Sequence, residues 1–338
     1  MKEATRCVSV IGAGAWGTAL GSVLAGKGHT VKVWSFEGDV ASYINEKRTN
    51  PYLPGVELPE TLRATTDLES AVSDAQLIVS ATPSQFVRGV MEHAGHHISS
   101  ESLLVSASKG IELGTNLRME EVLTEVLSGV LSEPLSVLSG PSFAAEVAAG
   151  VPTTVVVASR DEAIAIRVRE FFQNPSFRIY TNTDVTGVEL GGSLKNVVAL
   201  AAGVTAGLGM GHNTTAAVIT RGLAEITRLG VAVGAEQATF YGLAGVGDLV
   251  LTCNASLSRN RTVGYRLGQG ESLEEILSDM AAVAEGVKTT EAAYELASQH
   301  EVEMPITEKM YAIVHEGRDP SEALRALMAR DPKSEEWS

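Results

Sequence analysis

One lysine lies in the middle of a long apolar stretch of the sequence, GVELGGSLKNVVALAAGVTAGLG, which runs from Gly187 to Gly209. A charged side chain in apolar surroundings is costly unless it is paired with an opposite charge or has a shifted pKa. Lys195 therefore has either a partner or a chemical task. A lysine whose pKa is lowered by desolvation can donate a proton near neutral pH, as the reduction of a ketone by hydride transfer requires at the carbonyl oxygen.

Glycines accompany this lysine along the helix that the stretch predicts, with Asp184 as its N-cap. Gly191 and Gly192 lie four and three positions before Lys195, on the same face of such a helix. Each glycine inside a helix costs about 0.5–1 kcal/mol relative to alanine, so these two and Gly187 indicate that something approaches closely. Two explanations stay open: another helix that packs there, or a ligand beside the lysine.

Two further charged residues follow short apolar segments elsewhere in the chain. Lys109 lies in SASKG, after a predicted strand, and is either a solvated surface lysine or a second cation that lowers the pKa of Lys195. Asp248 lies in GVGDLVL and is either a helix N-cap or a carboxylate that positions Lys195 and a substrate hydroxyl.

A basic cluster near a predicted helix start could bind a phosphate. The segment SLSRNRTVG carries Arg259 and Arg261, and a guanidinium beside a helix N-terminus is well suited to a phosphate group. The chain has 26 basic and 41 acidic residues and a formal charge of −15, so a local basic cluster is informative.

The N-terminal segment CVSVIGAGAWGTALGSVLAGKGHTVKVW predicts the elements that would hold a dinucleotide. A strand is followed by Gly12-x-Gly14-x-x-Gly17, then by a helix and a second strand. In this context the first glycine permits a tight turn, the second lets backbone N–H groups approach a pyrophosphate, and the third lets helix and strand pack closely. Trp16 would lie beside that cofactor.

The choice between NAD and NADP depends on the end of the second strand, where an acidic residue would bond the ribose diol and repel a 2′-phosphate. Ser35 occupies that position, Glu37 follows two residues later, and Arg48 lies on the next segment. We expect both cofactors to work, with a modest preference for NADPH through Arg48.

Further strands are predicted at AQLIVSATP, SLLVSASKG, PLSVLSGPS, TTVVVASR and FRIYTN, with helices between them, whereas the chain is helical from Asp184 onward. This alternation predicts an α/β fold, with a Rossmann-type doubly wound parallel sheet over residues 1–183 and an all-α substrate and catalytic domain over 184–338. Ligands bind beyond the carboxyl ends of such strands.

The composition, 44% hydrophobic and 20% charged over 338 residues, is that of a soluble globular protein. A charge of −15 disfavours nucleic acid and anionic membranes as partners, and the apolar run from Val197 to Met210 is shorter than the roughly 20 residues of a membrane span. Without a secretory segment and with only two cysteines, we expect a cytoplasmic location. No metal site is expected, because no carboxylate or cysteine completes a set with the histidines His93, His96 and His97.

The motifs SASKG, SGPSFAAE, ELGGSLKNV, GLAGVGDL and SRNR follow the glycine triplet in this order, and together they resemble the bacterial NAD(P)-dependent glycerol-3-phosphate dehydrogenases over residues 6 to 318. The resemblance implies interconversion of sn-glycerol 3-phosphate and dihydroxyacetone phosphate for phospholipid synthesis by a cytoplasmic homodimer. It implies that Lys195 is the proton donor and acceptor. Substrate-contacting positions would be Lys109, Gly140, Ser142, Lys195, Asp248, Ser258, Arg259 and Asn260, and cofactor-contacting positions would be Ala15, Trp16, Phe36, Lys109, Ala144, Arg259, Val283 and Glu285.

Two positions depart from the family pattern: Ala15 stands where many relatives have serine, and Phe36 where a basic or histidine side chain often helps to bind the 2′-phosphate. Two other functions remain open. One is a related dehydrogenase for another small phosphorylated or carboxylated alcohol. The other is a redox sensor that binds nicotinamide without chemistry, which would need no lysine on a cleared helix face.

Overall fold

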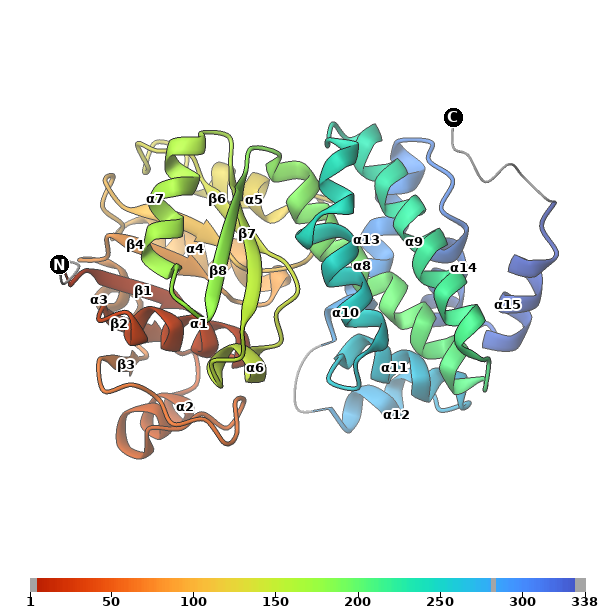
Figure 1. Cartoon of the computed structure of the whole chain (residues 1–338), viewed down its shortest axis with the longest axis horizontal. Helices are drawn as coiled ribbons and strands as arrows, with labels where there is room; N and C mark the ends of the chain where they lie inside the picture. The colour runs from red at the N-terminus through yellow and green to blue at the C-terminus, as the bar shows by residue number, and fades with distance from the viewer. Residues whose placement is uncertain (1–4, 281–283, 332–338) are drawn as a thin grey trace.

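The computed structural model describes residues 5–280 and 284–331, and its N-terminal part is built on one eight-stranded sheet (Figure 1). The strand order is β3-β2-β1-β4-β5-β6-β7-β8, so the chain leaves β1 toward β2 and β3 and then returns to the other side of β1. Ligands of such sheets bind at this change of direction, beyond the carboxyl ends of β1 and β4. The strands are β1 (Cys7–Ile11), β2 (Thr30–Trp34), β3 (Leu62–Thr65), β4 (Leu77–Ser80), β5 (Leu103–Ser106), β6 (Ser136–Ser139), β7 (Thr153–Ser159) and β8 (Phe177–Asn182).

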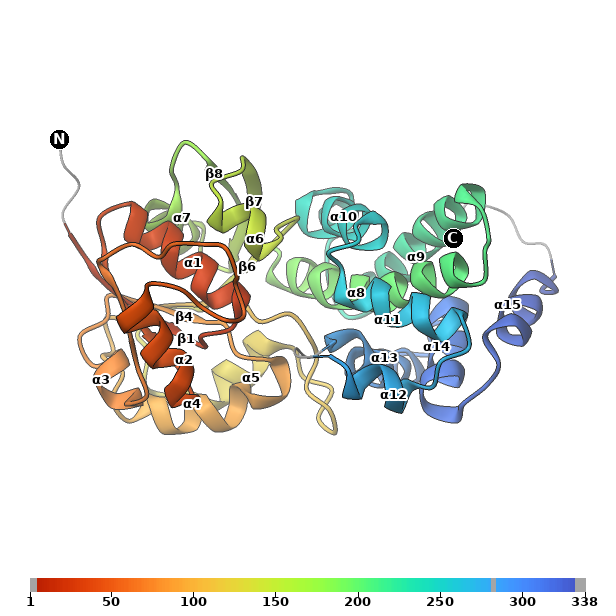
Figure 2. The ribbon, with the colours of Figure 1, turned by 90° about the horizontal axis from the view of Figure 1, so that it is seen from below.

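Helices cover both faces of this sheet, as the view in Figure 2 shows. One apolar core joins the strands to α1, α2, α6 and α7, and a second joins them to α3, α4 and α5. The α/β class that the sequence predicts is confirmed. The helices are α1 (Ala15–Gly26), α2 (Gly38–Ser42), α3 (Leu68–Val72), α4 (Val87–Gly95), α5 (Met119–Val126), α6 (Ala144–Ala148) and α7 (Glu162–Phe172), with short turns η1 (Tyr43–Lys47) and η2 (Ser84–Phe86).

The sheet differs from the sequence prediction in two respects. β7 runs antiparallel to β6, whereas all strands were expected to be parallel. The intervening helix α6 has only five residues and is about 7.5 Å long, too short to carry the chain back along the sheet, so the next strand begins where β6 ends. The sequence analysis also missed β3, a four-residue strand that pairs with β2.

The C-terminal part is helical and packs around α8 (Val185–Gly207). Asp184 caps this helix as predicted, because its carboxylate accepts a hydrogen bond from the Gly187 N–H at 2.8 Å. From Val185 to Thr205 every residue except Thr186 is buried. The surrounding elements are α9 (His212–Ala232), η3 (Gln237–Tyr241), η4 (Leu243–Gly247), α10 (Asp248–Asn254), α11 (Arg259–Gly268), α12 (Leu273–Ser278), α13 (Glu285–Gln299), α14 (Pro305–Glu316) and α15 (Pro320–Met328).

Helices α8 and α11 pack backbone against backbone through glycines. A Cβ atom at Gly203 would lie 2.1 Å from the Arg261 carbonyl oxygen, and one at Gly264 would lie 2.0 Å from the Leu200 carbonyl oxygen. Only glycine permits this approach, since real Cβ atoms do not come so close to backbone atoms. The contact fixes the first turn of α11, which carries Arg259, relative to the helix that carries Lys195.

The loop after β5 joins the two parts of the chain. Ile111 from this loop is fully buried in the helical core, and the Ser193 hydroxyl on α8 donates to the Gly110 carbonyl at 3.3 Å. Near the end of the same loop, the Asn116 amide donates to Glu295 on α13 at 3.0 Å. These contacts position Lys109, which lies at the start of the loop, against α8.

Candidate active site

Three charged side chains from distant parts of the sequence meet in one buried cluster. The Lys195 Nζ lies 2.5 Å from Asp248 Oδ1, and the Lys109 Nζ lies 2.7 Å from Asp248 Oδ2. The Asp248 side chain is 1% exposed, that of Lys195 9% and that of Lys109 18%. The carboxylate therefore binds one ammonium group with each oxygen.

This geometry excludes two of the alternatives that the sequence left open. Asp248 is the first residue of α10, but its side chain makes no capping bond, because the N-cap is Gly247 and both carboxylate oxygens face lysines. Lys109 is no solvated surface lysine: it also donates to the Gly140 carbonyl at 3.2 Å.

Thr252 belongs to the same cluster, although the sequence analysis did not single it out. Its hydroxyl accepts a hydrogen bond from the Lys195 Nζ at 3.0 Å and donates to the Asp248 carbonyl at 2.6 Å. The spacing of four residues from Asp248 on one helix face was the available signal. Lys195 thus has two fixed acceptors that hold its ammonium group.

Burial dominates the electrostatics of the cluster. The pKa of Lys195 is lowered from 10.5 to about 8: desolvation is the largest cause, the Asp248 charge opposes it, and the nearby Lys109 charge adds to the lowering. Burial alone would raise the pKa of Asp248, but the charges of Lys109 and Lys195 and their hydrogen bonds hold it below its usual value. A lysine with such a pKa exchanges a proton readily at neutral to mildly alkaline pH.

The glycines near Lys195 make room for the protein chain rather than for a ligand. A Cβ atom at Gly191 would lie 2.5 Å from the Ala244 carbonyl oxygen, and one at Gly192 would lie 2.4 Å from the Ser139 hydroxyl. A Cβ atom at Gly187 would collide with the Asp184 carboxylate that caps the helix. The glycines are therefore explained by close packing of the chain and need no ligand at their positions. Close packing places β6 and η4 against α8.

The predicted anion-binding segment forms the start of α11. The Ser258 hydroxyl caps this helix by accepting the Arg261 N–H at 3.2 Å, and the Asn260 side chain accepts the Gly286 N–H at 3.0 Å. Arg259 is exposed to solvent, but surrounding protein partly desolvates its guanidinium and lowers its pKa, while Glu285 raises it. Across the described residues Arg259 makes no ion pair, so its guanidinium is available to an anion.

The loop after β6 contributes Gly140, Ser142 and Ala144. Gly140 has a φ of 130°, and its carbonyl accepts hydrogen bonds from the Lys109 Nζ and from the Ser142 hydroxyl, the latter at 2.9 Å. Ala144 begins α6 and packs against the core of the sheet. Ser142 is therefore held close to the Lys109 side of the cluster.

The turn between β1 and α1 fits a dinucleotide pyrophosphate. Gly12 has a φ of 120°, and a Cβ atom there would meet the Ala81 backbone at 2.8 Å. Gly14, the N-cap of α1, has open space where its Cβ would be, so a ligand can approach the backbone. A Cβ atom at Gly17 would lie 2.0 Å from the Gly12 carbonyl oxygen. Ala15 and Trp16 form the first turn of α1, and the Trp16 Nε1 is buried without a hydrogen-bond partner in the described chain.

Arg48, expected from the sequence to favour NADPH, bonds to the backbone of its own loop. Its two terminal guanidinium nitrogens donate to the backbone carbonyls of Leu62 at 2.9 Å and Leu58 at 2.8 Å. Arg48 therefore closes its own loop, and both of its terminal nitrogens are already bound to backbone carbonyls. The expected preference for NADPH rested on this residue. Phe36, which the resemblance places at the cofactor, is 86% exposed.

Glu285 lies at the start of α13 and bonds the loop after β4. Its carboxylate accepts hydrogen bonds from the Ser84 N–H at 3.2 Å and from the Ser84 hydroxyl at 2.8 Å. Burial raises the pKa of Glu285, and the bonds from Ser84 oppose this shift. This contact joins the loop after β4 to the helical C-terminal part of the chain. Val283, the neighbouring predicted position, lies outside the described residues.

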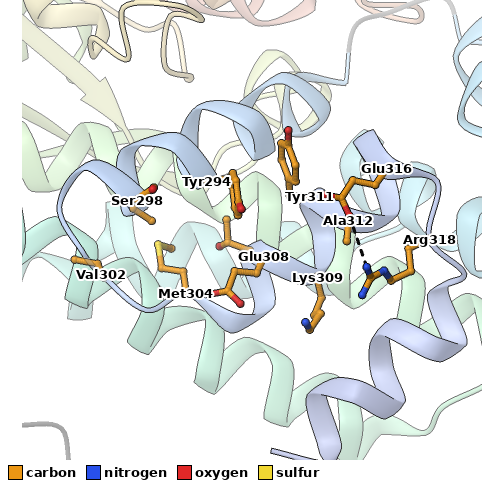
Figure 3. A pocket seen from close by; sticks show the side chains of 12 residues that line it. Tyr294, Ser298, Val302, Met304, Glu308, Lys309, Tyr311, Ala312, Glu316 and Arg318 are labelled. Carbon is orange, nitrogen blue, oxygen red and sulfur yellow. Dashed lines mark ion pairs between the residues drawn. The ribbon is translucent and has the colours of Figure 1, made fainter.

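A surface cavity of about 330 Å³ lies elsewhere, between α13 and α14 (Figure 3). Tyr294, Met304 and Tyr311 line it, and none of the cluster around Lys195 does. Residues 5–280 and 284–331 contain no set of three histidine, cysteine or acidic side chains arranged to hold a metal ion. No helix in these ranges is long and apolar enough to cross a membrane.

Comparisons with known proteins identify the family of the chain. Residues 7–165 match the family model of the NAD-dependent glycerol-3-phosphate dehydrogenase N-terminus, and residues 184–325 match that of its C-terminus. The chain is 53% identical to a glycerol-3-phosphate dehydrogenase [NAD(P)+] of Geobacter sulfurreducens, with 98% of this chain and 99% of the relative covered. A relative of the same name in Leptospira biflexa is 52% identical, with 97% and 99% covered.

Solved structures extend the similarity to the fold. The crystal structure of glycerol-3-phosphate dehydrogenase from Coxiella burnetii superposes with a TM-score of 0.92 at 39% identity, covering 96% of this chain and 99% of that one. A D-mandelate dehydrogenase complex with NADH has a TM-score of 0.63 at 13% identity, covering 92% of this chain and 98% of that one, and shares the fold alone.

Proposed function

The chain belongs to the NAD-dependent glycerol-3-phosphate dehydrogenase family, and on that premise we propose which of its residues perform the reaction. The protein is an oxidoreductase that interconverts sn-glycerol 3-phosphate and dihydroxyacetone phosphate with NAD(P). The observation that supports the assignment of roles is the buried cluster in which Asp248 binds both Lys195 and Lys109.

Lys195 is the proton donor and acceptor of this proposal. When bound, the cofactor supplies or accepts the hydride at the carbon atom. As the ketone is reduced, negative charge develops on the carbonyl oxygen, and the Lys195 ammonium donates a proton to it. In the oxidation direction the neutral amine accepts the hydroxyl proton. Asp248 and Thr252 orient the Nζ, and the Lys109 charge helps to keep its pKa low.

We assign substrate binding to residues of α11 and of the loop after β6. Arg259 is the main anchor for the phosphate, because its guanidinium is free of ion pairs among the described residues and lies in the first turn of α11. Ser258 and Asn260 flank it in the sequence, and Gly140 and Ser142 contribute beside Lys109.

The cofactor would lie along the turn from Gly12 to Gly17, with its pyrophosphate at the N-terminus of α1. Trp16 would then cover it, and its unpaired Nε1 is a donor without a partner in the described chain. The remaining contacts of this proposal are Ala15, Phe36, Lys109, Ala144, Arg259, Val283 and Glu285.

The pH dependence of activity is expected to follow the pKa of Lys195. Reduction needs the protonated amine, so kcat/KM for dihydroxyacetone phosphate should fall as the pH rises through about 8. Oxidation needs the neutral amine, so kcat/KM for glycerol 3-phosphate should rise through the same pH. Initial rates in both directions between pH 6 and 10, at constant ionic strength, measure these opposite changes in kcat/KM.

A matched variant identifies the group that titrates. Because Asp248 raises the pKa of Lys195, Asp248→Asn should move the pH profile to lower pH. A profile that stays at the same pH in this variant would contradict the assignment of the titration to Lys195.

The substrate is tested by comparing ketones with the purified protein. We expect rapid oxidation of NADH or NADPH with dihydroxyacetone phosphate and at least about tenfold lower kcat/KM with dihydroxyacetone, since a charge-assisted phosphate contact contributes about 1.5–3 kcal/mol. A higher kcat/KM for another phosphorylated or carboxylated ketone would favour the related dehydrogenase. Binding of NADH without turnover of any ketone would favour the redox sensor.

The same family resemblance leads us to propose that the enzyme works as a homodimer in the cytoplasm and supplies glycerol 3-phosphate for phospholipid synthesis. The charge of −15 supports a role away from nucleic acid and anionic membrane surfaces. We further propose that residues 1–183 form the dinucleotide-binding domain and residues 184–338 the substrate and catalytic domain.

A further inference from the structure

A chain of hydrogen bonds links the dinucleotide turn to the end of β2. The Gly12 N–H donates to the Trp34 carbonyl at 3.1 Å, so the ends of β1 and β2 lie side by side. Asn50, which is 1% exposed, donates from its side chain to the Ala13 carbonyl at 2.8 Å and to the Thr18 hydroxyl at 2.7 Å. The loop that carries Asn50 is thereby attached to the turn.

Tyr52 extends this chain to an acidic side chain. Its N–H donates to the Asn50 side-chain oxygen at 2.8 Å, and its hydroxyl lies 3.0 and 2.9 Å from the two carboxylate oxygens of Glu37. The hydrogen bond to Glu37 raises the pKa of Tyr52, with desolvation as a further cause. The phenol therefore stays protonated and holds the carboxylate just beyond β2.

No ion pair neutralises Glu37 within the part of the chain that the structure describes. Arg48 is bound to backbone carbonyls, Phe36 is uncharged, and the described residues provide no ion pair for Glu37. In a Rossmann-type site the adenosine ribose lies between the first βα turn and the end of the second strand, where a carboxylate accepts bonds from the diol and repels a 2′-phosphate.

We propose that Glu37, positioned by Tyr52, sets the choice between the two cofactors and disfavours the 2′-phosphate of NADPH. This inference rests on the proposed function, because it requires a bound dinucleotide. It reverses the modest NADPH preference expected from the sequence. One partly exposed charged contact changes affinity about five- to tenfold, and salt weakens the effect.

The test uses cofactor fragments that cannot react. Isothermal titration calorimetry of ADP-ribose and 2′-phospho-ADP-ribose with the full chain measures the binding of the adenosine ribose end of the cofactor alone. The parent protein should bind ADP-ribose at least as tightly as its 2′-phosphate. Glu37→Gln should change the ratio of the two Kd values about five- to tenfold in favour of 2′-phospho-ADP-ribose. The change should be smaller at high salt.

Tyr52→Phe tests the positioning role, because it removes only the hydroxyl and leaves Glu37 charged. The freed carboxylate can turn into solvent, so the ratio should move in the same direction, about two- to threefold. The double variant should match Glu37→Gln alone, since Tyr52 acts through Glu37. Shifts that add in the double variant would show that Tyr52 acts independently.

Glu57→Gln is the matched control, because Glu57 is an exposed carboxylate of the loop that carries Asn50 and Tyr52. Its Kd ratio should equal that of the parent. The inference fails if Glu37→Gln leaves the ratio within twofold of the parent, or if Glu57→Gln shifts it as much. Such a result leaves the reaction assignment intact, because that assignment is judged by turnover of dihydroxyacetone phosphate.

Discussion

Replacing Lys195 with alanine should lower kcat in both directions by at least about 100-fold, the contribution of a positioned general acid. The variant loses the only amine that both Asp248 and Thr252 hold in place among the described residues. Binding of NADH or NADPH should persist, since the dinucleotide turn lies on the sheet and its contacts are independent of Lys195. Single-turnover rates and fluorescence titration of the reduced cofactor measure the two effects separately.

Two further variants separate proton transfer from charge and from folding. Lys195→Arg keeps a cation beside Asp248, but a guanidinium stays protonated at all working pH values and should be nearly as inactive. Lys195→Met keeps the bulk, and Asp248 still has Lys109 as a partner at 2.7 Å, so the fold should persist by circular dichroism. If Lys195→Ala keeps more than about half of the parent activity, another group moves the proton.

Arg259→Ala should raise the KM for dihydroxyacetone phosphate at least about tenfold, because it removes a charge-assisted contact worth about 1.5–3 kcal/mol. The KM for dihydroxyacetone, which has no phosphate, should change much less. In the parent enzyme, inorganic phosphate or sulfate should compete with the phosphorylated substrate, and this competition should weaken in the variant. Initial rates with both ketones, at fixed ionic strength, give the comparison.

Arg261→Ala is the control, because Arg261 lies two residues further on the same helix and belongs to the same basic cluster. Both variants lose one charge, so general electrostatic attraction changes equally. A large increase in KM for Arg261→Ala, with normal kinetics for Arg259→Ala, would move the phosphate anchor to Arg261.

Local sequence was sufficient for the elements whose signals are local. The Gly12-x-Gly14-x-x-Gly17 turn follows from backbone geometry, because a side chain at Gly12 or Gly17 would strike the chain itself. The N-cap Asp184 and the apolar length of α8 likewise depend on neighbouring residues alone. The order of motifs along the chain was also enough to indicate the family.

Features that depend on distant residues could not be predicted in the same way. Arg48 was expected to bind a phosphate, but its guanidinium bonds two backbone carbonyls in a loop whose path the sequence does not reveal. The antiparallel direction of β7 depends on the length of α6 in the folded chain, and Thr252 and Tyr52 gain their roles only through contacts.

The sequence by itself determined that a lysine would be buried on a glycine-bearing helix, and that it needed a partner or a task. Only the tertiary structure decided that its partners are Asp248 and Thr252. Asp248 is 53 residues from Lys195 and 139 residues from Lys109 along the chain, so no local pattern relates them. Packing of the loop after β5 and of α10 against α8 brings the three charges together. Burial there removes water, which lowers the pKa of Lys195 to about 8 even beside a carboxylate.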